Sequence, residues 1–108
     1  MLLIENIITI NKRFASGKIV NKRGLDLALS SPEKGWMDQV ASLVKALVVG
    51  HAFEDGNKRT AAVIIAAYYT EFEISFDTRE IYKIMVEIES KGIDDTDKIK
   101  ELIKSVIR

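Results

Sequence analysis

The sequence predicts an all-α protein, a compact helical bundle around one buried central helix. Three observations favour this class. Apolar residues recur at intervals of three and four over several segments. The segment 57–72 is apolar on almost every side, which is typical of a helix buried on every side. The length of 108 residues suits one domain, residues 1–108, because a second hydrophobic core would not fit.

The first expected helix spans Leu3–Ala15, and Gly17 is its expected stop. Its apolar stripe comprises Ile4, Ile7 and Ile8, with Phe14 as a candidate fourth member. A basic loop punctuated by glycines follows over 16–24. A short helix is expected over Leu25–Leu29, and the single proline, Pro32, marks the next loop.

Helical spacing predicts a third helix over Trp36–Val49, and the central helix over Asn57–Phe72. The residues Glu73–Phe76 are expected to form a short extended piece. Two further helices complete the chain. One begins after an N-cap at Asp77 and ends at Gly92, and the other begins near Asp97, with Asp95 or Thr96 as its cap.

Composition excludes several function classes. Lys and Arg total 16 and so do Asp and Glu, so bulk attraction to nucleic acid is not expected. There is no cysteine, which excludes disulfides and thiolate metal sites. The longest apolar run, 61–69, is too short to span a bilayer, and the N-terminal residues lack the pattern of a signal peptide. We therefore expect a cytoplasmic protein without membrane contact.

The residues with the strongest chemical signal lie at the start of the central helix. The first amides of a helix have no internal acceptors, and with the helix dipole they form an anion site. Gly56 allows a ligand to approach the backbone there, at the turn into Asn57. Lys58 and Arg59 oppose the helix dipole, so they suit a phosphate held between them and the amides better than helix stability alone.

Three more residues complete this segment. Asp55 offers a hard oxygen ligand suited to a Mg²⁺ ion that bridges phosphates. His51 lies a few residues upstream of the glycine, and histidine is the side chain that most often acts as a general base on a hydroxyl. Phe53 is expected to anchor the loop in the core. Taken singly, each residue has an ordinary explanation as a helix cap, turn or solvated charge, but their combination over 51–59 favours a functional site.

The stretch from His51 to Arg59 resembles the motif H-x-F-x-[DE]-G-N-x-R of the Fic family. Lys58, followed by Thr60 and Ala61, makes it more similar to the Doc (death-on-curing) branch. The motif is long and specific. The resemblance extends over nearly the whole chain, because residues 14–29 resemble the Doc flap with its short helix and residues 73–107 resemble a Doc C-terminal half.

This resemblance implies roles for individual residues. His51 would be the general base on a protein hydroxyl, and Asp55 would hold Mg²⁺. ATP phosphates would be held by Gly56, Asn57, Lys58 and Arg59. The flap that aligns the target peptide, as a short β-hairpin or extended segment, would comprise Lys18, Ile19, Val20, Asn21, Lys22 and Arg23. Without the resemblance, this stretch is interpreted as an ordinary solvated loop.

The resemblance also implies an activity. A Doc-like toxin would transfer the γ-phosphate of ATP to a Ser or Thr of a translation factor of the elongation factor Tu type. Ala62 stands where Fic adenylyltransferases carry a second arginine, which favours phosphate over AMP transfer. No [ST]-x-x-x-E-[GN] inhibitory helix is evident, so a separate small antitoxin is expected. The alternatives are a Fic-type adenylyltransferase and a catalytically silent module that binds a nucleotide or a partner.

Overall fold

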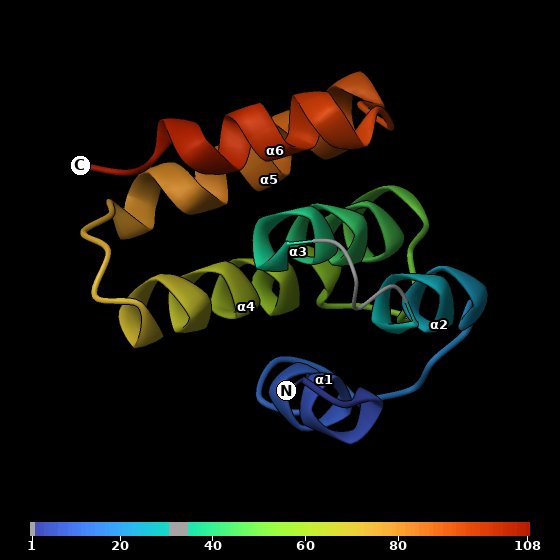
Figure 1. Ribbon diagram of the computed structural model, residues 1–108. Helices are drawn as coiled ribbons and strands as arrows, with labels where there is room; N and C mark the ends of the chain where they lie inside the picture. Colours follow the sequence, from blue (N-terminus) through green and yellow to red (C-terminus); the bar gives the residue numbers. More distant parts are fainter. Residues whose placement is uncertain (1, 31–34) are drawn as a thin grey trace.

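The computed structural model describes residues 2–30 and 35–108, and it confirms the all-α fold class (Figure 1). Pro32 and its expected loop lie outside the described residues. The described elements are the helices α1 (Ile4–Asn11), α2 (Arg23–Leu29), α3 (Trp36–Val44), η1 (Lys45–Val49), α4 (Asn57–Glu71), α5 (Thr78–Lys91) and α6 (Thr96–Ser105).

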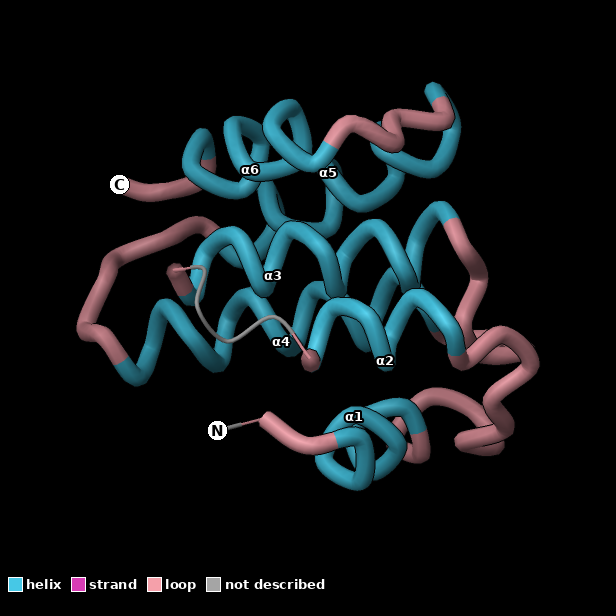
Figure 2. Tube along the Cα trace, turned by 45° about the vertical axis from the view of Figure 1, so that its right-hand side comes forward, coloured by secondary structure: helices cyan, strands magenta, loops and turns pink. Residues whose placement is uncertain are grey.

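The helices are arranged in layers. Figures 1 and 2 both show α3 and α4 in the middle, α5 and α6 together on one side, and α1 on the opposite side. The short helix α2 packs against α3 and η1. Within the described part of the chain, every helix is too short or too polar to cross a membrane.

The helix α4 is central, as predicted, because it contacts α1, α3, η1 and α5. The expectation that it is buried on every side is wrong. Ile64, Ile65 and Tyr69 are fully buried, whereas Ala67 is exposed and Ala66 is only partly buried. The neighbouring helices leave one strip of α4 open, and small alanine side chains occupy part of that strip.

Two predicted helix limits are wrong by a few residues, and a third helix has the predicted limits but changes type along its length. The first helix ends at Asn11, four residues before Ala15, because the chain continues in tight turns with Phe14 N–H donating to the Asn11 carbonyl. The second helix begins at Arg23, two residues before Leu25. The third segment is helical as far as Val49, but its last part, η1, is a π-helix. Such turns are frequent near functional sites.

The predicted helix caps are confirmed in the C-terminal half. The Asp77 carboxylate accepts hydrogen bonds from the first-turn amides of α5, and Gly92 ends that helix in the left-handed conformation, with φ of 60°. Asp95, one of two candidates, caps α6. The expected extended piece over Glu73–Phe76 is confirmed at Phe76, which forms an antiparallel bridge with Ile107, but not at Glu73, which lies in the turn after α4 with a φ of 57°.

Tyr69 joins α4 to α6. Its ring is fully buried, and its hydroxyl donates a hydrogen bond to the carbonyl of Ile103. Trp36 packs edge-on against the same ring, with 6.0 Å between centroids. Burial raises the pKa of Tyr69 to about 12, because the phenolate form would be poorly solvated there.

We expect Tyr69→Phe to reduce the sensitivity of the fold to alkaline pH. Tyrosine ionises near pH 10 in the unfolded chain, while folded Tyr69 stays neutral to about pH 12. Its contribution to stability is therefore complete below pH 10 and is lost as pH rises toward 12. Between pH 9 and 11 the wild type should lose about 1 kcal/mol more unfolding free energy than the variant. Urea unfolding at the two pH values checks this, and equal losses would contradict it.

Candidate active site

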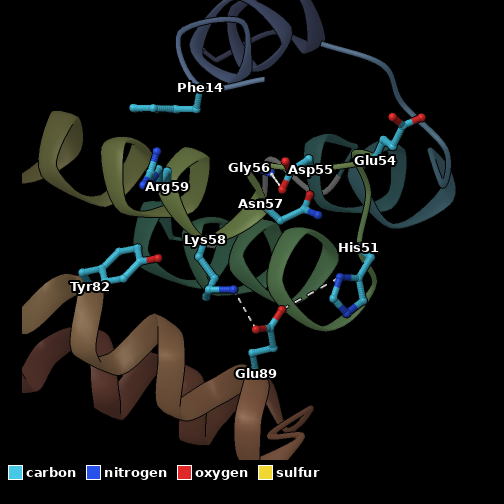
Figure 3. A pocket seen from close by; sticks show the side chains of 10 residues that line it. All are labelled: Phe14, His51, Glu54, Asp55, Gly56, Asn57, Lys58, Arg59, Tyr82 and Glu89. Carbon is cyan, nitrogen blue, oxygen red and sulfur yellow. Dashed lines mark hydrogen bonds and ion pairs between the residues drawn. The ribbon is translucent and has the colours of Figure 1, made fainter. Parts of the chain in front are cut away.

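A cavity of about 460 Å³ opens at the start of α4 (Figure 3). All six motif residues predicted to carry the chemistry line it, so the structure brings them together. The lining residues are His51, Asp55, Gly56, Asn57, Lys58 and Arg59, together with Phe14, Glu54, Tyr82 and Glu89. The predicted flap residues 18–23 are not among them.

The loop turns into α4 at Gly56, which has a φ of 76° in the left-handed region. A Cβ at this position would lie 3.1 Å from the side-chain Nδ2 of Asn11 and 3.3 Å from the Cβ of Ala15. Two constraints therefore favour glycine here: the left-handed backbone conformation, and the close approach of Asn11 and the segment that follows it.

Asn11 holds the loop from the side of α1, and the sequence analysis missed this role. Its side chain is fully buried. The Nδ2 group donates to the Asp55 carbonyl at 2.9 Å and to Thr60 Oγ1 at 3.1 Å, while Oδ1 accepts from the Gly17 amide at 2.9 Å. One signal was available, since Asn11 continues the apolar stripe of Ile4, Ile7 and Ile8 with a polar residue.

Asn57 supports the loop from within. Its Oδ1 accepts from the Phe53 amide and its Nδ2 donates to the Phe53 carbonyl, both at 2.9 Å. Because the side chain is buried and engaged in the loop, the backbone amide is the group that Asn57 offers to a phosphate. Phe53 is buried as well, so the predicted anchoring role of its ring is confirmed.

The predicted flap is extended and runs beside the loop. Ile19 and Phe53 form an antiparallel bridge. The amide of Val20 donates to the Ala52 carbonyl at 2.8 Å, and the amide of Glu54 donates to the Lys18 carbonyl at 3.0 Å. Lys22 and Arg23 are exceptions, because Lys22 is the N-cap of α2 with α-helical backbone angles and Arg23 is the first residue of that helix. The backbone of the flap is thus hydrogen-bonded to the loop that leads into the cavity.

The first turn of α4 is suited to an anion. In the part of the chain that the structure describes, no side chain caps this turn. The amides of Asn57, Lys58 and Arg59 have no intrahelical acceptor because no helical turn precedes them, and the positive end of the helix dipole lies at the same place. The exposed Arg59 side chain lies against the Phe14 ring, with its guanidinium carbon 5.9 Å from the ring centroid.

Lys58 is paired with Glu89, a residue of α5 that the sequence analysis did not single out. The Lys58 Nζ donates to Glu89 Oε1 at 2.7 Å. This hydrogen bond, opposed in part by burial, raises the pKa of Lys58. A phosphate that binds Lys58 would therefore compete with this carboxylate. No local pattern around Glu89 distinguishes it from the other acidic residues of α5.

His51 lies at one end of the cavity, beside the same glutamate (Figure 3). Its Nδ1 is 4.0 Å from Glu89 Oε2, and its side chain is 60% exposed. The backbone of His51 has a φ of 50°, which is unusual for a residue with a side chain and is frequent at functional sites. The imidazole is open to a hydroxyl that approaches from solvent.

Asp55 fits a magnesium ion only as a shared ligand. Its Oδ1 accepts from the Gly56 amide at 2.8 Å, so Oδ2 remains for a cation. Within residues 2–30 and 35–108, no group of three or more His, Asp or Glu side chains could hold a metal by itself. Mg²⁺ commonly binds through one or two carboxylates plus substrate phosphates, and Asp55 suits that arrangement.

We expect Asn11→Ala to loosen the loop before α4. The change leaves the Asp55 carbonyl and the Gly17 amide, whose hydrogen bonds with Asn11 are partly buried, without their side-chain partner, which should lower the unfolding free energy by about 1–3 kcal/mol. Hydrogen exchange at the Gly17 amide should accelerate.

Asn6→Ala is the matched control for this prediction, because Asn6 lies on the same helix but is exposed. It should change stability by at most about 1 kcal/mol and leave Gly17 exchange unaltered. Unchanged exchange at Gly17 in Asn11→Ala would contradict the role given to Asn11.

Comparison with known proteins identifies the family. The sequence model described as the Fic/DOC family matches residues 5–69, more than half of the 108-residue chain. The matched range contains most of α1, the flap, the loop and most of α4, and the match does not distinguish the Doc branch. The comparisons with curated proteins and with solved structures give no match. The chain belongs to the Fic/Doc family.

Proposed function

We propose that this protein is a cytoplasmic Doc-like toxin that transfers the γ-phosphate of ATP to a Ser or Thr hydroxyl of a translation factor. The expected target is of the elongation factor Tu type, and a separate small antitoxin would restrain the activity. Membership of the Fic/Doc family supports a nucleotide-dependent transferase. The observation that carries the proposal is one cavity lined by His51, Asp55, Lys58, Arg59 and the uncapped start of α4.

In this mechanism the imidazole of His51 accepts the proton of the target hydroxyl. The hydroxyl oxygen forms a bond to the γ-phosphorus, the bond from that phosphorus to the β–γ bridging oxygen breaks, and ADP leaves. His51 then releases the proton to solvent. Its exposure and its place at one end of the cavity suit this role, because the target residue is part of another protein.

The phosphates would lie over the first turn of α4, where Lys58, Arg59 and the amides provide positive charge. The cavity is not basic overall, because three carboxylates from Glu54, Asp55 and Glu89 face two cations. A polyphosphate therefore needs an additional cation. Asp55 would share Mg²⁺ with the phosphates, and the ion would neutralise charge that develops on them.

Two features favour phosphate transfer over AMP transfer. Lys58 provides a charge at the beginning of α4, and Ala62, one turn further along, provides none. The flap would align the target peptide by accepting it as an added strand along Lys18, Ile19, Val20 and Asn21. Lys22 and Arg23 do not belong to this stretch, because Lys22 is the N-cap of α2 and Arg23 is its first residue.

We expect His51→Ala to lower turnover by about 10²- to 10⁴-fold, because it removes the general base. Stability should change by about 0.5 kcal/mol or less, since the side chain is mostly exposed. ATP affinity should be unchanged. Single-turnover assays, thermal unfolding and calorimetric binding measure the three quantities. Turnover equal to that of the wild type would remove His51 from the mechanism.

The kind of group transferred can be tested with purified elongation factor Tu, Mg²⁺ and ATP labelled on either the γ- or the α-phosphate. Label from the γ-position alone is expected on the factor, and it should be absent with His51→Ala. Label from the α-position would identify an adenylyltransferase. Bound ATP with no label transferred to any protein of a lysate would identify a silent nucleotide-binding module.

A further inference from the structure

The end of the cavity farthest from His51 is aromatic, and the proposed chemistry does not account for this. Figure 3 shows Phe14 and Tyr82 at that end, with Arg59 between them and the residues Asp55–Lys58 between this end and His51. Both rings are more than a third exposed, at 37% and 40%. Large apolar rings usually find burial elsewhere in a small domain, so two exposed rings in one polar cavity indicate a ligand with an aromatic part.

The backbone of Phe14 is held close to the loop before α4, and this places the ring at the end of the cavity. The Phe14 amide donates to the Asn11 carbonyl at 2.9 Å, and the Asn11 side chain holds the Asp55 carbonyl. The position of a Cβ on Gly56 would be 3.5 Å from the Cβ of Phe14. Phe14 therefore lies beside the anion site. The expectation that it joins the apolar stripe of α1 is wrong.

Tyr82 approaches from the opposite side, on α5. Its phenol is close enough to Lys58 to contribute to the raised pKa of that lysine, after the hydrogen bond with Glu89 and the charge of Glu89. The two rings thus come from segments on different sides of α4, and the phosphate-binding cations lie next to both. Aromatic rings and arginine guanidinium planes are the surfaces on which nucleobases stack.

We propose that Phe14 and Tyr82 form the nucleobase subsite of this cavity, with a purine as the ligand class and the guanidinium of Arg59 as an additional flat surface. This inference rests on the proposed nucleotide-dependent function. The base at this end and the phosphates over the start of α4 direct the end of the phosphate chain toward His51 (Figure 3). The arrangement is consistent with transfer of the terminal phosphate.

The test compares ATP with inorganic tripolyphosphate, which has the phosphates but lacks the base and the ribose. Calorimetry with Mg²⁺ measures the dissociation constants of ATP and of inorganic tripolyphosphate for the wild type, Phe14→Leu and Tyr82→Leu. Each substitution should weaken ATP binding by about 5- to 100-fold, because stacking on one ring is lost. Tripolyphosphate binding should change by less than about twofold. Tyr82→Phe, which keeps the ring, should retain most of the ATP affinity.

Phe72→Leu is the matched control, because Phe72 is also exposed but lies beyond the other end of α4, packed on Trp36. It should leave both constants unchanged. Unaltered ATP binding in both Phe14→Leu and Tyr82→Leu would overturn the proposal of a base subsite, and the proposal of an anion site would stand. Equal losses for both ligands in Phe14→Leu would also overturn it, since Phe14 would then act only by placing Arg59. A wild type that binds neither ligand would overturn the proposed function and this inference together.

Discussion

The buried side chain of Asn11 is the constraint on which the site depends. It connects the end of α1, the start of the flap, the loop and the first turn of α4 through three hydrogen bonds. A buried amide in an apolar core is costly unless its partners are all present, so this network favours one arrangement of the four segments. Gly56 allows the close approach that these bonds require.

The consequence is that the proposed anion site is already formed in the structure without a ligand. Asn57 uses its side chain to close the loop on Phe53, and its backbone amide is left at the uncapped start of α4. The positions of Lys58 and Arg59 follow from the helix. The opposite wall comes from α5, which adds Glu89 and Tyr82 beyond the range matched by the family. The range matched by the family thus covers one wall of the cavity, and the wall formed by α5 lies outside that range.

Much of the fold and one wall of the site could be predicted from the sequence, because the signals are local. The stretch from His51 to Arg59 is consecutive, and helix periods and caps such as Asp77 are short-range patterns. Glu89 and Tyr82 could not be found this way, since their roles depend on packing of α5 against α4. The same limit explains Phe14, whose spacing fitted the apolar stripe but whose position is set by the turns that follow Asn11.

The proposed function requires that the first turn of α4 binds phosphate. Backbone amide chemical shifts, followed by NMR during a titration with inorganic pyrophosphate and Mg²⁺, test this requirement most directly. We expect the largest changes on the amides of Asn57, Lys58 and Arg59, and we expect them to saturate together. Saturable changes centred on another part of the chain, or none at millimolar pyrophosphate, would contradict it.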